Sequence, residues 1–442
     1  MKVGIIGGGA AGMFAAVNLK ELCPAADVTV VEAGARMLAK VAVTGGGRCN
    51  LTNTFADVRS LESVYPRGHR LMKRLLHGFS AADTWAWFEG HGVPLAVRRD
   101  FDARCSASER ECIFPASQDA MSVVRCLTHE ARKRGVRFLN NARVAELTAV
   151  GEAGGPPAFE VTFSAAKGAP PLRFDRVLVT TGGCPAAVAR PEAQRFPCAV
   201  GVRGDAEAAI LLPAEPPVPS LFTFSLPASP LRGLMGLVVD PVGVAIAGTK
   251  LRADGALLAT HWGVSGPAVL RLSSYAARHL ADTGYRATLL VNWLHHATQA
   301  EATAALMQQA AATPQRQVSS VAPLGLPHRL WQQLAERADV PVERRWAELG
   351  RKQLNRLADL LTCDAHAIEG KSRWKEEFVT CGGISLAAVD ARLQCRAVPG
   401  LYFAGEVLDV DAVTGGFNLQ AAWTMGMTAA RALAAEGAEN GR

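Results

Sequence analysis

Residues 3–12 read Val3-Gly4-Ile5-Ile6-Gly7-Gly8-Gly9-Ala10-Ala11-Gly12, an apolar run followed by a glycine hexamer of the pattern G-x-G-x-x-G. The apolar run predicts a short buried strand, and the helical spacing of apolar residues over 10–22 predicts a helix after the hexamer. A second, β-branched run at 28–31 ends at Glu32, about twenty residues beyond the last glycine. Strand, turn, helix and strand therefore predict a Rossmann-like βαβ unit that binds a dinucleotide.

Each glycine of the hexamer has a physical role in holding a pyrophosphate. Gly7 permits the tight turn, Gly9 lets the backbone approach the phosphates, and Gly12 lets the helix pack closely on the strand. The helix start at Ala11 offers N–H groups and the positive end of the helix dipole. Glu32 accepts hydrogen bonds from the ribose hydroxyls in this interpretation. The alternative is a glycine-rich turn in a Rossmann-like fold that binds no nucleotide.

A second segment, far along the chain, distinguishes FAD from NAD. Residues 401–404 predict a strand that ends at Gly405-Glu406, and Gly416-Phe417-Asn418-Leu419 opens the last predicted helix. A carboxylate at that strand end accepts from a ribityl hydroxyl. The helix start offers N–H groups near flavin N1 and O2, where negative charge accumulates on reduction. We therefore expect FAD as the cofactor. The alternative is a surface turn capped by Asp and Gly.

The sequence pattern between these two segments changes from β-like to helical. Residues 191–293 carry short β-like runs broken by Gly and Pro, and residues 294–364 have a helical pattern rich in Ala, Gln, Leu and Arg. We predict an FAD-binding domain in two parts, 1–190 and 365–442. A β-rich domain and then a helical subdomain interrupt it.

Composition narrows the class of protein. The 442 residues carry ten scattered cysteines and a formal net charge of +7. Without C-x-x-C pairs or zinc-finger spacing, the cysteines predict neither a disulfide scaffold nor a metal site, and reduced thiols fit a cytoplasmic protein. No apolar run reaches the roughly 18 residues of a membrane helix, so we expect no membrane span.

One loop resembles a family signature. Residues 44–53, Thr44-Gly45-Gly46-Gly47-Arg48-Cys49-Asn50-Leu51-Thr52-Asn53, resemble the GGGRCN-x-TN motif of bacterial NAD(P)/FAD-dependent oxidoreductases, also described as aminoacetone-oxidase-like. Stretches 260–268, 379–384 and 403–419 are similar to the same family. The resemblance implies an α/β fold, with a glutathione-reductase-like FAD-binding domain interrupted by a β-barrel-like domain and a small helical subdomain. The chain departs from the family pattern at Glu111-Cys112, which leaves the substrate open.

The resemblance also implies which residues contact the cofactor. The residues implied to contact the pyrophosphate are Gly7, Gly9, Ala11 and Gly12, and the residue implied to contact the ribose is Glu32. Those along the pyrophosphate, ribityl chain and flavin are Lys40, Gly46, Gly47, Arg48, Cys49 and Asn50. Those near the adenosine half are Thr181 and Gly182, and those at the ribityl chain and flavin ring are Gly405, Glu406, Gly416, Phe417, Asn418 and Leu419.

Known chemistry in the family includes reduction of carbon–carbon double bonds, in branches similar to bile-acid ene-reductases and to ribosomal RNA dihydrouridine synthases. Such a reaction needs a proton as well as a hydride. We predict Cys49 as the catalytic thiol, and the alternative is that it only packs in the loop. Cys112 and Cys381 are the next candidates for the catalytic role. His261 either points at substrate or is a satisfied histidine. Residues 180–183 lack a second hexamer, so we expect NAD(P)H to dock transiently as the reductant; the alternative is that another donor reduces the flavin.

The partner is a small molecule or ribosomal RNA. Basic residues cluster in three places, and phosphates bind such patches, although solvated helix faces have the same composition. The clusters are Arg67, Arg70, Lys73 and Arg74; Arg132, Lys133 and Arg134; and Arg329, Arg337, Arg344, Arg345, Arg351, Lys352, Arg356, Lys371, Arg373 and Lys375. The alternative function is a nucleic-acid-binding flavoprotein acting on ribosomal RNA without turnover, in which FAD is structural or sensory. The sequence leaves the oligomeric state open.

Overall fold

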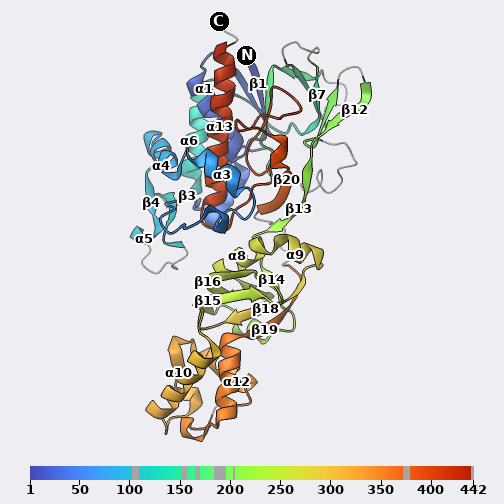
Figure 1. The fold of residues 1–442 in the computed structure, drawn as a ribbon. Helices are drawn as coiled ribbons and strands as arrows, with labels where there is room; N and C mark the ends of the chain where they lie inside the picture. The colour runs from blue at the N-terminus through green and yellow to red at the C-terminus, as the bar shows by residue number, and fades with distance from the viewer. Residues whose placement is uncertain are drawn as a thin grey trace. The chain divides into compact units, whose positions relative to one another are not determined.

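The computed structural model describes residues 1–101, 109–150, 157–164, 170–183, 196–202, 205–341, 343–371 and 379–439. The chain divides into two compact units (Figure 1). Unit 1 comprises Met1–Cys105, Glu109–Val218 and Val379–Arg442, and unit 2 comprises Ser106–Ser108 and Pro219–Phe378. Arg373 and Lys375 of the third basic cluster lie outside the described residues.

A parallel five-stranded sheet forms the centre of unit 1. Its strand order is β21-β10-β1-β2-β6, and every neighbouring pair is parallel. The strands are β1 (Lys2–Ile6), β2 (Asp27–Val31), β6 (Arg137–Leu139), β10 (Arg176–Val179) and β21 (Leu401–Phe403). The order reverses at β1, and open α/β sheets bind ligands beyond the carboxyl ends of the strands at such a point. The predicted Rossmann-like fold is confirmed.

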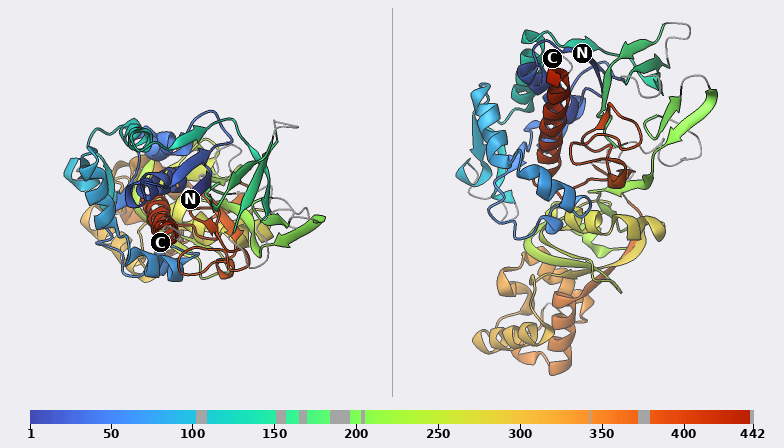
Figure 2. Two further views of the ribbon diagram at one scale, coloured as in Figure 1. Left: turned by 90° about the horizontal axis from the view of Figure 1, so that it is seen from above. Right: turned by 45° about the horizontal axis from the view of Figure 1, so that its top comes forward.

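Helix α1 (Ala10–Leu22) follows β1 and packs along the last helix, α13 (Phe417–Glu439). The two helices lie side by side in both views of Figure 2. Gly426 of α13 permits this approach, because a Cβ there would lie 2.8 Å from the carbonyl oxygen of Ala11. The buried Phe14 ring packs at centroid distances of 4.6 Å from Trp87 and 5.3 Å from Trp423. Residues some 400 positions apart therefore share one core.

The remaining elements of unit 1 surround this sheet. Its other helices are α2 (Ala39–Gly47), α3 (His69–Leu76), α4 (Ala81–Gly90), α5 (Arg98–Phe101) and α6 (Ala120–Lys133). A three-stranded sheet has the order β3 (Thr52–Asn53), β5 (Cys112–Pro115) and β4 (Leu95–Val97), and a five-stranded sheet has the order β12 (Asp205–Leu211), β11 (Ala199–Val202), β7 (Val144–Ala149), β8 (Phe159–Phe163) and β9 (Leu172–Phe174). Finally, β13 (Ala214–Ser220) pairs with β20 (Val379–Ile384).

Unit 2 is built on a six-stranded antiparallel sheet with helices. The strand order is β14 (Phe224–Ser225), β17 (Gly263–Ser265), β16 (Arg252–Ala259), β15 (Val238–Ile246), β18 (Arg286–Asn292) and β19 (Asp364–Glu369). The two edges meet: Phe224 bridges Lys371, and Ser225 N donates to Gly370 O at 2.9 Å. The sheet thus closes on itself, as a barrel-like insertion requires. The helices are α8 (Pro267–Tyr275), α9 (Ala277–Asp282), α10 (Gln299–Ala312), α11 (His328–Arg337) and α12 (Arg351–Thr362).

A buried carboxylate ties unit 2 together. Asp364, which is fully buried, accepts hydrogen bonds from Arg337 and, at 3.0 Å, from Trp293 Nε1, and His366 Nε2 lies 3.0 Å from it. Burial alone would raise the pKa of Asp364, but hydrogen bonds from His366 and Arg337 and their charges hold it below its usual range. Arg337, a member of the third basic cluster, is therefore used inside the fold.

The two-unit division places its boundaries differently from the four parts expected from the sequence. Residues 199–218 belong with unit 1, because β11 pairs with β7. The helices of 294–364 belong with the β-rich insertion, because α12 packs on β18 and β19. The four-part division stays a prediction. Among the described residues, no helix combines the length and the apolar character that crossing a membrane needs.

Candidate FAD site

Two glycines at the start of α1 stand where no side chain fits. Gly7 has a φ of +114°, and a Cβ there would lie 2.3 Å from the carbonyl oxygen of Thr180. A Cβ on Gly12 would lie 2.0 Å from the carbonyl oxygen of Gly7. These are the tight turn and the close helix–strand packing that the sequence predicts for the two positions.

The space in front of Gly9 is open. Gly9 is the N-cap residue of α1, and no side chain among the described residues caps the helix there. A Cβ on Gly9 would meet no atom within 4 Å. The first intrahelical acceptor, Gly9 O, is used by Met13 N, so the amides of Ala10 and Ala11 face outward without a partner in the helix. An uncapped helix start with open space before it fits a pyrophosphate.

Glu32 lies at the end of β2, beside this turn. One carboxylate oxygen accepts from Gly8 N at 2.8 Å and the other accepts from Gly34 N at 2.6 Å. A carboxylate offers about four lone-pair positions, so two remain for the hydroxyls of a ribose. The backbone bonds fix the orientation of the carboxylate, which fits the predicted ribose contact.

A second cluster joins four segments of the chain at Glu406. Its Oε1 atom accepts from Thr380 N at 2.7 Å, and its Oε2 atom lies 3.6 Å from Lys40 Nζ. A Cβ on Gly182 would lie 3.6 Å from Oε2 of the same carboxylate. The structure thus brings together the predicted residues Lys40, Gly182 and Glu406. Thr181, the residue before Gly182, follows β10 in the chain.

Gly405 connects the two halves of the site. It has a φ of +82°, and a Cβ there would lie 3.1 Å from the Cβ of Ala11 in the first turn of α1. The end of β21 therefore lies against the helix start that faces the open space at Gly9. The N-terminal hexamer and the C-terminal acid belong to one site, as the sequence predicts for FAD.

The signature loop, residues 44–53, runs from the irregular end of α2 to β3 and has an unusual backbone. Gly45, Gly46, Gly47 and Cys49 all have positive φ angles, of 59°, 68°, 84° and 62°. A Cβ on Gly46 or Gly47 would meet no atom within 4 Å, so this backbone also borders open space. Arg48 turns back: its Nε donates to Gly45 O at 3.1 Å, and its guanidinium carbon lies 5.4 Å from the centroid of the Phe114 ring.

The loop meets the start of α13. A Cβ on Gly416, whose φ is +88°, would lie 2.2 Å from the carbonyl oxygen of Thr52. With the Asn50 amide oriented to satisfy both of its ends, its oxygen accepts from Gly416 N and its nitrogen donates to Thr52 O, each at 3.2 Å. Asn50 is therefore a positioning residue in this structure: it holds the loop against the helix start.

The side chains of Phe417 and Asn418 are engaged within the protein. The Phe417 ring is buried and packs edge-on against Phe55, with centroids 5.1 Å apart. Asn418 makes two 2.9 Å hydrogen bonds to the backbone of Ala412. What these residues can offer a flavin is thus their backbone N–H groups and the helix dipole. Leu419 is half-buried in the same first turn.

Cys49 is fully buried. Burial raises the pKa of its thiol to about 12, against a smaller lowering effect of a hydrogen bond with Thr44. The thiol therefore stays protonated and shielded from solvent, which favours the packing alternative. Cys112 on β5 and Cys381 on β20 are also buried. His261 is an exposed residue of unit 2 whose ring contacts Trp262 edge-on at 4.6 Å.

The sequence did not reveal the role of Thr380, and it indicated a different role for Arg67. Thr380 supplies a backbone donor to Glu406, and backbone donors carry no signal of their own in a sequence. Arg67, assigned to a basic cluster, instead forms a bidentate pair with the buried Asp411, with Nε 2.5 Å from Oδ1. Arg67 also follows the pattern of the other basic residues already in ion pairs, such as Arg134 with Glu130 and Arg356 with Asp339.

A family model described as the HI0933-like protein Rossmann domain matches residues 1–432. The chain belongs to this family. It is thus a member of a family of FAD-dependent oxidoreductases, and the residues described above fit FAD. The resemblance seen in the signature loop is confirmed.

Relatives match over nearly the whole chain. A Clostridium scindens protein named 3-dehydro-bile acid delta(4,6)-reductase is 27% identical, over 98% of this chain and 99% of its own length. An Escherichia coli protein named ribosomal RNA dihydrouridine synthase is 28% identical, over 98% of this chain and 97% of its own. Among solved structures, a mutant of E. coli quinol fumarate reductase FrdA is similar in fold, with a TM-score of 0.50, 14% identity and coverage of 100% of this chain and 71% of that one.

Proposed function

We propose that this protein transfers hydride from reduced FAD to an activated carbon–carbon double bond of a small molecule or of an RNA uridine, with NAD(P)H as electron donor. Two relatives support this reaction class by their names, a delta(4,6)-reductase and a dihydrouridine synthase. Both names describe addition of two hydrogens to an unsaturated ring. The two substrates share little else, so the names support the reaction more strongly than any one substrate.

The convergence of two remote segments at one helix start carries the proposal. Gly405 lies against Ala11, and Glu406 lies beside Lys40. Bound FAD supplies a hydride at its N5 atom. The protein's part would be to bind and orient the cofactor: the α1 amides would hold the pyrophosphate, Glu32 would hold the ribose, and the start of α13 would offer its positive dipole end to the flavin.

A reduction of this kind also needs a proton beside the hydride. Cys49 is the predicted donor, but its full burial supports a packing role. Its hydrogen-bond partner is a side chain of the same loop, Thr44. We therefore propose that Cys49 packs in the site with its thiol protonated, and that solvent supplies the proton that accompanies the hydride.

A small molecule is the first candidate substrate. Several arginines of the basic clusters already pair with acids, among them Arg67, Arg134 and Arg337, which reduces the positive charge available to phosphates. RNA is the second candidate. It is supported by the name of the E. coli relative and by the net charge of +7.

Anaerobic reduction of the purified protein tests the proposal. We expect a yellow protein whose flavin absorbance bleaches with NADPH or NADH and returns on addition of a cyclic enone or a uridine-containing ribosomal RNA fragment. The acceptor that restores the absorbance identifies the substrate class. A flavin that no nicotinamide reduces would contradict the proposed donor. If that flavin also stayed inert to dithionite and acceptors while the protein bound RNA tightly, the alternative of a nucleic-acid-binding flavoprotein would replace the proposal.

A further inference from the structure

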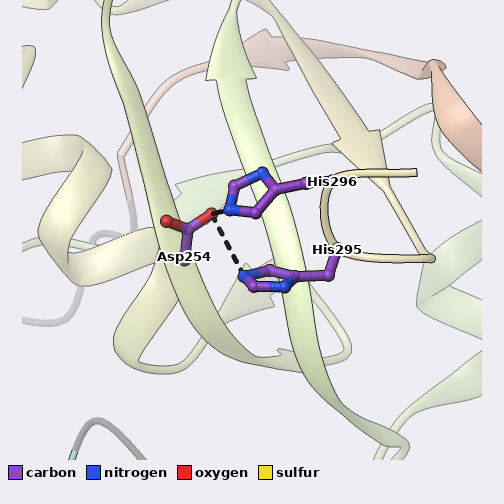
Figure 3. Close-up of side chains that lie close together, drawn as sticks. All are labelled: Asp254, His295 and His296. Atoms are coloured by element: carbon purple, nitrogen blue, oxygen red, sulfur yellow. Dashed lines mark ion pairs between the residues drawn. The ribbon is translucent and has the colours of Figure 1, made fainter. Parts of the chain in front are cut away.

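Two adjacent histidines and an aspartate meet at one point of unit 2 (Figure 3). His295 and His296 lie on the loop after β18, and Asp254 lies on β16. The ligand atoms of the three side chains all lie within 4.8 Å of one another. We propose that Asp254, His295 and His296 bind a divalent transition-metal ion, with zinc as the first candidate.

The distances match a shared ion better than a direct ion pair. The Nε2 atoms of His295 and His296 lie 3.7 and 3.3 Å from the same oxygen, Oδ1 of Asp254. A charge-assisted hydrogen bond would shorten such a distance to about 2.7–2.9 Å. Tetrahedral zinc, with ligand bonds of about 2.0–2.2 Å, places neighbouring ligand atoms about 3.3–3.5 Å apart. Figure 3 shows both rings turning a nitrogen toward the carboxylate. The two nitrogen–oxygen distances lie within a few tenths of an ångström of that spacing.

The register of the sheet explains why these residues meet. Gly243, on the middle strand β15, pairs with Asp254 on one side and with Asn292, the last residue of β18, on the other. A Cβ on Gly243 would lie 2.4 Å from the carbonyl oxygen of His295. The absence of a side chain on β15 therefore lets the histidine loop lie over that strand and reach across to Asp254.

The loop is held in one conformation. The Asn292 side chain accepts from Leu294 N at 3.0 Å and donates to Ala297 O at 2.9 Å, spanning both histidines. His295 has a φ of +67°, a left-handed conformation that is costly for a residue other than glycine. Strain of this kind persists where the surroundings fix it and is concentrated at functional sites. The two imidazoles are thus positioned before any ligand binds.

The chemistry of the three groups selects the class of ion. Two imidazole nitrogens and one carboxylate oxygen suit zinc and its neighbours, whereas magnesium and calcium prefer oxygen ligands alone. The three side chains are between 41% and 66% exposed, so an ion enters directly from solvent. Three protein ligands leave a fourth tetrahedral position for water or another small ligand.

Calorimetric titration of the tag-free, FAD-loaded protein with zinc chloride tests the site. We expect one zinc ion bound per chain, with an excess of magnesium chloride giving no competition. Titration with cobalt chloride should give the visible absorption of a low-symmetry cobalt complex. Asp254→Asn and His295→Gln should each weaken zinc binding by about 100-fold, since even residues behind the ligands alter metal affinity by roughly 10–100-fold.

His328→Gln is the matched control, because it removes an exposed histidine elsewhere in unit 2 and should leave zinc affinity unchanged. Unchanged flavin absorbance and thermal midpoints show that each variant is folded. If wild-type protein takes up no zinc, or if Asp254→Asn binds it as tightly as wild type, the proposal is overturned. The three residues would then be a surface ion-pair group that binds no metal.

Discussion

Substitution of Gly9 by alanine separates cofactor binding from folding. A Cβ at this position meets no protein atom within 4 Å, and the backbone (φ −81°, ψ −165°) is one that alanine adopts freely. The loss of a favourable N-cap residue and the reduced entropy of the unfolded chain oppose each other. We therefore expect the free energy of unfolding of the apoprotein to change by less than about 1 kcal/mol.

FAD binding should respond much more strongly to the same change. If the pyrophosphate lies in the open space before Gly9, the added methyl group stands between it and the α1 amides. Each hydrogen bond to a charged group contributes about 1.5–3 kcal/mol, so losing one or two costs about 3 kcal/mol. That is roughly a 100-fold weaker FAD dissociation constant.

The assay is fluorescence titration of apoprotein with FAD, alongside urea denaturation of the same samples. Gly350→Ala is the matched control: Gly350 is the N-cap residue of α12, with a similar backbone (φ −78°, ψ 160°) and no atom within 4 Å of an added Cβ. It should keep wild-type FAD affinity. If Gly9→Ala binds FAD as tightly as Gly350→Ala does, the pyrophosphate does not lie where we place it.

Three further predictions concern the fold around the sites. Gly12→Ala should lower the free energy of unfolding by about 3 kcal/mol in urea denaturation, because its Cβ would lie 2.0 Å from a backbone oxygen that cannot move away; an unchanged midpoint would refute the packing described. At pH 8 iodoacetamide should label the exposed Cys363 and spare the buried Cys49; rapid labelling of Cys49 would show that substrate-sized molecules reach it. Because burial raises the pKa of the Cys49 thiol, the free energy of unfolding should also fall as the pH rises from 9 toward 12. Asp364→Asn should cost about 3–5 kcal/mol, because it breaks a buried pair, whereas Asp339→Asn, in an exposed pair, should cost under about 1 kcal/mol; equal losses would contradict the assigned burial.

The backbone geometry of the candidate site was predictable because glycine specifies it. A Cβ at Gly7, Gly12 or Gly416 would collide with a backbone oxygen, and Gly405 has a positive φ that favours glycine. Glycine at such positions is visible in a sequence. Glu32 was predictable for a similar reason, since its place follows from strand length and helix length. A backbone conformation that depends on one residue type can be predicted directly from the sequence.

Side-chain roles that depend on distant partners were not predictable. Asn418 resembles a flavin contact in sequence, yet its amide is used by the backbone of Ala412. Arg67 resembles a phosphate-binding residue but pairs with Asp411, 344 positions away. A site at His295 and His296 was not predictable, because Asp254 lies on a strand distant in sequence and only the register of the sheet brings it near. Metal-ligand spacing motifs cover ligands within one loop, not ligands assembled by a sheet.

The pairing of α1 with α13 has a consequence for synthesis on the ribosome. Met13, Phe14 and Val17 are made first, yet roughly 400 residues must follow before the helix that covers them exists. At roughly 5–20 residues per second, that interval is about 20–80 s. During it, the buried face of α1 lacks its partner, and strand β21 at the edge of the central sheet is missing. We expect protease protection of α1 in stalled nascent chains only after α13 has emerged. Until then the unit 1 fold and its candidate FAD site are incomplete, so a chaperone would have to bind the exposed apolar face of α1.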